Sequence, residues 1–523
     1  MLYALRSMLR AALLLSIVLP LRGFGLAAVQ DAPAASAAVP DDGQAGAELV
    51  LTLEDAMRMA IERNLELELE ALNTEIANFD YLGSWGAFDP IASLSASMRD
   101  SESQGSSGLS GGDVVSSDTQ SLSGGLNVPF TTGGDLDLTY SRENTRTTNS
   151  FALFDTSTTD VVTVALTQPL LRNGWSRFAT SNQREAELAL KQQQARNEEV
   201  RQRVLRDVAV AYWDVVGAVE DLEVRRVAVE TARTQLDQNR RRLDVGVGTE
   251  VDVLQAETNV AQLEEQRLLA ESTLRAAEDT LRALLFQRGA DIMVQAASWD
   301  LPIRALTPLP EVDGDVPAWT SSLERALTAR PELIRQRLEI EAAEVRLDRA
   351  ESLRLPQLDF SLEASSAGFD ETPSDALSTA LGFDFPTYVG TLAFSMPIRN
   401  RTARYGERSA RAGVIASRIG YDQIELGVLS DVRTAVREIA FSGESVAAAQ
   451  KSAEFAQRQL DAEEARFDEG LSTTFQVLEF QRDLAEAQSA LTAARARYAK
   501  ALIGLRFAEG ELFPPRDEAD PAE

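Results

Sequence analysis

The chain has 523 residues, a formal net charge of -30 at pH 7, and neither cysteine nor histidine. Without these two residue types there is no thiol or imidazole catalysis and almost no transition-metal site, so no cofactor or metal is expected. The strong negative charge disfavours nucleic acid as a partner, because a phosphate backbone needs a basic protein face.

The N-terminus predicts an export signal. Arg6 and Arg10 precede an apolar run that extends from Ala11 to Leu21, as in a secretory signal peptide. A membrane anchor is the alternative, although the run is short for a helix that crosses a bilayer. We therefore assign 1–28 to a cleaved signal peptide and 29–51 to a flexible N-terminal segment. Because the chain lacks cysteine, we expect no lipid anchor on the mature N-terminus.

Internal repetition is the strongest pattern in the sequence. The segment AIERNLEL at 60–67 corresponds to ALTARPEL at 326–333, about 266 residues later. Farther along, RRLDVGVGTEVDVL at 241–254 corresponds to ARFDEGLSTTFQVL at 465–478, about 224 residues later. We interpret the chain as a duplication.

The two repeats are predicted at 52–286 and 319–512. The stretch between them, 287–318, is rich in Pro, Asp and Gly, which favours a surface linker. The acidic residues 513–523 form a tail that is expected to be disordered.

Each repeat begins with a helix and ends in a long helical hairpin, predicted at 175–286 and 402–508. In the first hairpin, proline is absent and apolar residues such as Leu205, Val208 and Tyr212 recur at helical spacing. The return helices keep a seven-residue apolar spacing, which buries a narrow seam against a neighbouring helix.

Between the helices of each repeat, apolar and polar residues alternate, within 91–168 and within 357–397. We count four strands in the first set and two in the second, which gives about eighteen in a trimer. The four residues Thr131 to Gly134 predict a tight turn between two of these strands, although 122–142 as a loop excursion is the alternative. Apolar-out, polar-in strands with unequal loops are typical of outer-membrane barrels.

This arrangement resembles the TolC family of outer-membrane efflux proteins, the outer-membrane factors. The duplicated plan, Leu-Thr-Gln-Pro at 166–169 before the long helix, and a Gly-X-X-Thr turn followed by Val-Leu carry the resemblance, which extends from about Leu51 to Leu512. It implies an α+β membrane protein in which a trimeric outer-membrane β-barrel is continuous with a long periplasmic α-helical coiled-coil barrel.

The resemblance also implies the function and the partners. The expected protein is not an enzyme but a passive exit duct of a tripartite efflux or type I secretion system. It would be a homotrimer in outer-membrane lipid, with its tunnel in the periplasm. A periplasmic adaptor would bind it and connect it to an inner-membrane transporter. The sequence does not identify the substrate.

The resemblance places the adaptor-docking tips at the two hairpin turns. Glycine permits the positive φ that such a reversal needs. The alternative is that these residues only cap helices, since Thr249 with Asp252 and Thr473 with Gln476 have capping-box spacing. The docking residues are Val245, Gly246, Val247, Gly248 and Thr249 in the first turn, and Glu469, Gly470, Leu471, Ser472 and Thr473 in the second.

The same family closes its tunnel near these tips, and the matching positions are Asp252, Gln476 and Glu479. A ring of carboxylates from three chains would favour cations. The alternative is a set of solvated acids in the first turn of a helix. Gln476 weakens the match, because the family pattern has a second acid in this stretch.

Three other functions compete with the duct. A periplasmic adaptor has a long hairpin but normally only one, and a coiled-coil scaffold does not explain the alternating strands. A hydrolase with paired carboxylates is the third alternative, but the abundant acids have the usual distribution of exposed helix faces.

Overall fold

The computed structural model describes residues 48–104, 114–150, 152–285, 292–293, 296, 299–312, 314 and 316–512. The predicted signal peptide, most of the predicted flexible N-terminal segment, part of the predicted linker and the acidic tail lie outside these ranges. All described residues belong to one compact unit, Glu48–Glu523.

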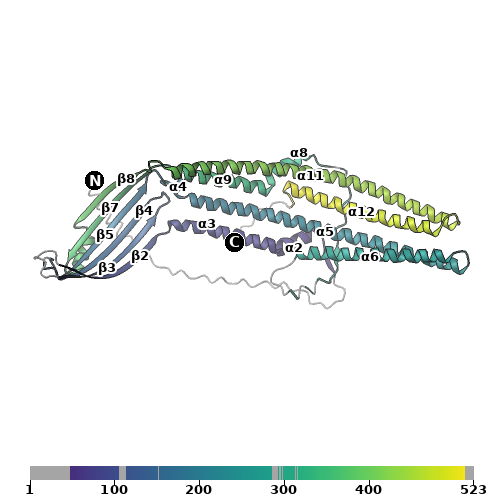
Figure 1. Ribbon diagram of the computed structural model, residues 1–523, viewed down its shortest axis with the longest axis horizontal. Coiled ribbons are helices and arrows are strands. Elements are labelled where there is room, and N and C mark those ends of the chain that lie inside the picture. The colour runs from purple at the N-terminus through teal and green to yellow at the C-terminus, as the bar shows by residue number, and fades with distance from the viewer. Residues whose placement is uncertain are drawn as a thin grey trace. The chain divides into compact units, whose positions relative to one another are not determined.

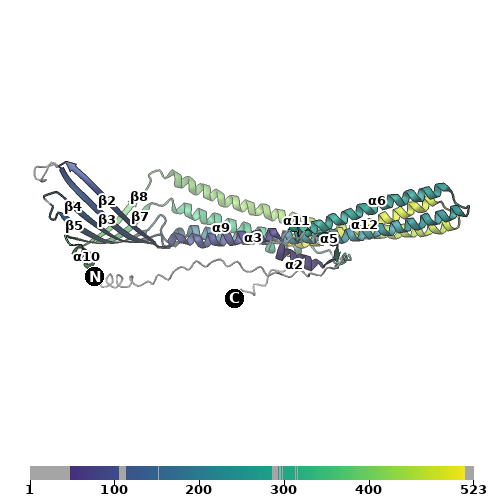
Figure 2. The same cartoon turned by 90° about the horizontal axis from the view of Figure 1, so that it is seen from below.

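Long helices and one large sheet make up this unit, and the sheet and the two hairpin turns lie at its opposite ends (Figures 1 and 2). The elements follow in this order: β1 (Leu49–Leu51), α2 (Leu53–Arg63), α3 (Leu65–Ser84), the 3-10 helix η1 (Trp85–Phe88), β2 (Ile91–Gln104), β3 (Val114–Pro129), β4 (Asp135–Thr147), β5 (Thr156–Pro169), α4 (Ser176–Ala179), α5 (Ser181–Asp244), α6 (Glu250–Leu284), β6 (Ile303–Ala305), α8 (Trp319–Ala329), α9 (Pro331–Ser352), β7 (Gln357–Asp370), α10 (Pro373–Gly382), β8 (Pro386–Ser395), α11 (Arg401–Asp468) and α12 (Thr474–Glu509).

The large sheet has six antiparallel strands in the order β2-β3-β4-β5-β7-β8. Directly paired residues of antiparallel strands point to the same face, so the register separates two kinds of residue. One row across the sheet is mainly apolar and the next is small and polar: Ala92, Leu126, Leu138, Val164, Ala364 and Tyr388 in the first, and Ser93, Gly125, Thr139, Thr163, Ser365 and Thr387 in the second.

The strands extend farther than the alternation indicates. β2 continues to Gln104 and β4 to Thr147, through polar residues beyond the alternating stretches. These residues pair because backbone hydrogen bonds of a ladder need no apolar side chains. The connection between β7 and β8 contains the unexpected helix α10, which packs on β7 and β5.

The helices pack side by side in the order α6-α5-α12-α11 near the turns, and α9 lies between α5 and α11 nearer the sheet. Two apolar cores hold them. One surrounds Leu205, Val208 and Tyr212 of α5, and the other surrounds Val432 and Ile439 of α11. Among the described helices, none is both long and apolar enough to span a membrane.

Two short strands lie within the predicted flexible segment, 29–51, and the predicted surface linker, 287–318. Within these segments, β1 and β6 pair in parallel, with Leu51 opposite Ala305. The hydroxyl of buried Tyr212 donates to the Leu51 carbonyl at 3.2 Å and accepts from the Thr307 amide at 3.0 Å. We call this pair the β1–β6 clip. The clip packs against α5, because Leu51 and Ile303 are buried in the apolar core around that helix.

The predicted continuous helix from about 176 is interrupted at Thr180. This residue has φ -96° and ψ 17°, which separates α4 from α5. Its hydroxyl donates to the Ser176 carbonyl at 2.7 Å.

Candidate functional site

The turn between α5 and α6 closes on one carbonyl. The amides of Val247 and Gly248 both donate to the carbonyl oxygen of Arg242, each at 2.9 Å. Gly246 has φ +77°, the left-handed conformation that glycine adopts without a steric penalty. A Cβ atom on Gly246 would meet no atom within 4 Å, so backbone conformation alone favours glycine here.

The turn between α11 and α12 repeats one of these two hydrogen bonds, 224 residues later. The Leu471 amide donates to the Arg466 carbonyl at 2.8 Å, and the Gly470 amide donates to the Phe467 carbonyl at 3.0 Å. Gly470 has φ +76°, and again no atom lies within 4 Å of a Cβ built on it.

Both turns expose apolar side chains to solvent. Val245, Val247 and Leu471 are 74%, 68% and 71% exposed. Further exposed apolar residues follow in the first turns of the return helices, namely Val251, Leu254 and Phe475. A cluster of exposed apolar residues marks an interaction surface more often than chance placement does. The turns therefore combine a hydrogen-bonded backbone with an apolar tip.

Asp252, a predicted constriction residue, is part of a helix cap. Its Oδ2 atom accepts from the Thr249 hydroxyl at 2.6 Å and from the Thr249 amide at 3.0 Å, while its own amide donates to that hydroxyl. The Thr249 hydrogen bonds lower the pKa of the Asp252 carboxyl, although partial burial opposes them. Asp252 therefore stays charged at neutral pH and fastens the start of α6.

The other two predicted constriction residues behave differently. The Gln476 side chain accepts from the Ser472 hydroxyl at 3.0 Å, and Thr473 caps α12 by accepting from the Gln476 amide. Ser472 also donates to buried Glu463. Glu479 lies about one turn farther along α12 and is exposed. Of the three, Glu479 is the side chain for which no hydrogen bond or ion pair to another described residue is found.

The structure reveals contacts between the two hairpins that the sequence analysis missed. The Arg242 guanidinium lies 4.4 Å from the centre of the Phe467 ring, which joins the two turns by a cation–π contact. Farther from the turns, Leu236 of α5, Ala256 of α6 and Leu478 of α12 form one apolar cluster. The run of arginines before the first turn was a signal, but its partner lies on a distant helix.

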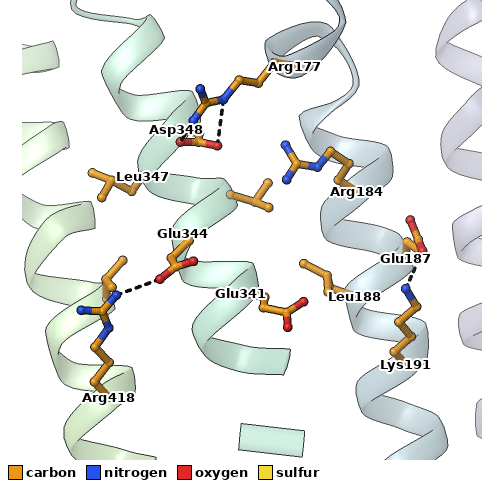
Figure 3. Close-up of a pocket in the computed structure, with 12 residues that line it drawn as sticks. Arg177, Arg184, Glu187, Leu188, Lys191, Glu341, Glu344, Leu347, Asp348 and Arg418 are labelled. Carbon is orange, nitrogen blue, oxygen red and sulfur yellow. Dashed lines mark hydrogen bonds and ion pairs between the residues drawn. The ribbon is translucent and has the colours of Figure 1, made fainter. Parts of the chain in front are cut away.

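A groove of about 520 Å³ lies far from the turns, between α5, α9 and α11 (Figure 3). Its walls are ion-paired: Arg177 with Asp348 at 2.6 Å, Arg418 with Glu344 at 2.9 Å, and Lys191 with Glu187 at 2.6 Å. Figure 3 shows Leu188 and Leu347 between these charged groups. The basic and acidic side chains of the groove are equal in number. We therefore interpret the groove as a packing contact between helices of the two halves.

A sheet with one apolar and one polar face, joined to two long helical hairpins, defines the fold of an outer-membrane channel. The family model described as outer membrane efflux protein matches residues 135–285 and 322–511. The chain belongs to this family.

Curated relatives and solved structures agree with this assignment. The chain is 27% identical over 367 residues to the outer membrane efflux protein BepC of Brucella suis, covering 68% of this chain and 74% of BepC. It is 24% identical over 343 residues to TolC of Vibrio cholerae, covering 65% and 74%.

Among solved structures, the Vibrio cholerae outer membrane protein VceC has a TM-score of 0.62 at 16% identity, covering 88% of this chain and 96% of VceC. The Campylobacter jejuni outer membrane channel CmeC has a TM-score of 0.62 at 17% identity, covering 88% and 86%. The predicted family and the predicted function as an outer-membrane efflux channel are confirmed. The adaptor and scaffold alternatives do not fit this family.

Proposed function

We propose that three copies of this chain, each an internal duplication, close into a passive exit duct. The sheets would form one β-barrel in outer-membrane lipid, and the hairpins would continue it as a tunnel in the periplasm. A periplasmic adaptor would dock on the turns and connect the duct to an inner-membrane transporter. The chain itself would catalyse no reaction. One observation carries this proposal. The described unit leaves its sheet open at β2 and β8 and its helices open at α3 and α11, and the two sides of each opening are complementary.

The first open edge is that of the sheet. β2 and β8 are its terminal strands, and each pairs on one side only. Unpaired backbone donors and acceptors of a long edge strand favour pairing with another chain. In a ring of copies, β8 of one chain would pair with β2 of the next, which leaves no edge.

The second open edge is that of the helices, where α3 and α11 flank the bundle. On α3, Leu69, Ile76 and Phe79 are 59%, 56% and 59% exposed. On α11, Ile419 and Leu426 are exposed as well. These residues recur at spacings of three and seven, so each helix presents an apolar stripe that no described element covers.

The charges beside these stripes are opposite. α3 carries five acids and no lysine or arginine, whereas residues 401–411 of α11 carry four arginines and one glutamate. α3 runs toward the sheet and α11 runs away from it, so the end of α3 that carries Asp80 and the end of α11 that carries Arg404 are both the ends next to the sheet. Contact between two different patches of the same chain generates a closed ring when the rotation permits it.

The turns support the rest of the proposal. Their exposed apolar tips fit a docking role for the adaptor, and the carboxylates of Asp252 and Glu479 fit a cation-sensitive constriction. We propose that the resting duct is closed at this end, and that adaptor and transporter supply the opening.

Single-channel currents test the duct and its constriction together. The mature chain, purified from detergent-solubilised outer membrane, is expected to give a small cation-selective conductance that divalent or trivalent cations block. Asp252→Ala with Glu479→Ala should remove the block. The exposed acids Glu250 and Asp468, substituted by alanine in the same way, form the matched control and should leave it intact. Block that survives the first double substitution moves the cation site elsewhere, and absence of current refutes the duct.

A charge exchange tests the ring contact. Arg404→Glu with Arg408→Glu should reduce the trimer fraction in native mass spectrometry, because acidic groups would then face the acidic edge of α3. Adding Glu75→Arg and Asp80→Arg should restore it. If the four-fold variant is no more trimeric than the double variant, α3 and α11 do not meet as proposed.

A further inference from the structure

We propose that the hairpin β3–β4 is an inserted segment of the barrel wall, and that it widens the outer-membrane opening for bulky hydrated cargo such as a polypeptide. This inference rests on the proposed three-copy duct, because only a closed barrel converts additional strands into additional width.

The two halves of the chain differ at this place. Between α3 and α5 the structure has four strands, whereas between α9 and α11 it has two strands and the short helix α10. The sequence correspondence shifts at the same place, from about 266 residues before the strands to about 224 after them. This difference of about 42 residues is large enough to contain the whole of β3 and β4 (114–147).

The hairpin is continuous with the wall and does not hang from it. β3 pairs with β2 from Val114 to Asn127 and with β4 from Ser117 to Pro129. The apolar row crosses it through Leu126 and Leu138, and the polar row through Gly125 and Thr139. An excursion into solvent would not keep one apolar and one polar face in register with its neighbours.

The turn of the hairpin is built into the junction between sheet and helices. Gly133 has φ +84°, and a Cβ atom there would lie 2.5 Å from the Asn173 carbonyl oxygen. The Thr132 carbonyl accepts from the Trp175 amide at 2.8 Å and from the Gln168 side chain at 3.0 Å. The turn therefore fixes the segment that enters α4.

A buried charge joins the hairpin to the strand that follows it. Asp160 of β5 is fully buried. It accepts two bonds of 2.8 Å from the Arg142 guanidinium and one of 2.8 Å from the Tyr140 hydroxyl, both on β4. Breaking one side of a buried pair is strongly destabilising, so β4 is held against β5 by specific chemistry as well as by the ladder.

The geometric consequence follows from strand number. Six strands per chain give eighteen in a closed trimer, whereas two strands per half would give twelve. Barrel diameter grows roughly linearly with strand number, so the opening would be about 1.5-fold wider, in the class that leaves an aqueous channel. Because coil size scales roughly as the square root of chain length, the largest polymer that enters would have about twice the mass.

The absence of cysteine permits a direct measurement. Ser365→Cys places one thiol on the polar row of β7, and polyethylene-glycol maleimides of graded mass then report the largest polymer that reaches it. We expect the limit in the complete chain to be about twice that in a variant lacking 114–147. Ser452→Cys, on the exposed surface of α11, is the control and should react with every size in both chains.

The outcomes separate this inference from the duct itself. An unchanged size limit, with trimers and channel currents retained, overturns the widening and leaves the duct standing. A complete chain without trimers or currents refutes the proposed function instead.

A second measurement needs no deletion and applies if the shortened chain does not fold. Nitroxide labels at Ser121→Cys, Leu122→Cys and Ser123→Cys of β3 should alternate in their environment. Leu122 should be relaxed by lipid-soluble oxygen, and both serine positions by a water-soluble nickel complex. Equal exposure to the nickel complex at all three positions places the hairpin outside the wall and overturns the inference.

Discussion

Gly246 and Gly470 allow the cost of the two turn conformations to be measured without interference from packing. Both have positive φ, +77° and +76°, and a Cβ on either would meet no atom within 4 Å. The left-handed conformation costs an L-residue about 1–2 kcal/mol. Gly246→Ala and Gly470→Ala should therefore ease local opening of their turns by this amount, which corresponds to about 5- to 30-fold at 1.4 kcal/mol per tenfold.

Hydrogen exchange provides the assay. The Val247 and Leu471 amides close the two turns, and each should exchange faster by that factor in its own variant. Gly504→Ala is the control, because Gly504 lies inside α12 and also has no atom within 4 Å of a Cβ. Alanine favours helix over glycine by about 0.5–1 kcal/mol, so exchange in α12 should slow. Unchanged exchange at the turns, or faster exchange in the Gly504 variant, contradicts the reasoning.

Two further predictions concern single hydrogen-bonding groups. The cap lowers the pKa of the Asp252 carboxyl. The stability that this carboxylate adds to the turn between α5 and α6 is therefore complete above the ordinary pKa of about 3.9. It is lost as the pH falls through the lower pKa of the folded state. The protection factor of the Val247 amide, which compares its exchange with the intrinsic rate at the same pH, should therefore fall on acidification in the natural chain and stay constant in Asp252→Asn. Tyr212→Phe leaves two buried backbone groups of the β1–β6 clip without their partner, at a cost of about 1–3 kcal/mol. Limited proteolysis between α6 and α8 should accelerate in this variant, and an unchanged cleavage rate would show that the hydroxyl does not hold the clip.

The sequence predicts those parts of the fold that depend on neighbouring residues, namely the turns, the helix caps and the strands. In each turn, a Gly is followed three residues later by a Thr and then by Asp252 or Gln476. This pattern predicts both a chain reversal and a helix cap within one short segment. Alternation likewise identifies strands, because a sheet with two different faces imposes a period of two. The register across six strands follows from the same pattern, since a slip of one residue would exchange the faces.

The features that escaped prediction depend on partners that are distant in the chain. β1 and β6 are three residues each and pair across about 250 positions, so neither has a periodic signal of its own. Arg242 lies in a run of arginines, but nothing in the sequence pairs it with Phe467, and only packing of the two hairpins brings them together. The polar ends of β2 and β4 show no apolar alternation that would predict a strand, whereas the ladder holds them through the backbone.

Asp252 caps α6, and the proposed constriction would use the same residue. Both Thr249 donors bond to the same oxygen, Oδ2, so the second oxygen of the carboxylate lies outside the cap. Asp252→Asn keeps an acceptor for Thr249 but removes the charge, whereas Asp252→Ala removes both. In a Glu479→Ala background, both variants should abolish cation block, and only the alanine variant should also accelerate exchange at Val247. If block is lost only together with turn protection, the carboxylate acts by holding the backbone. If asparagine removes the block while the turn stays protected, the charge itself meets the ion.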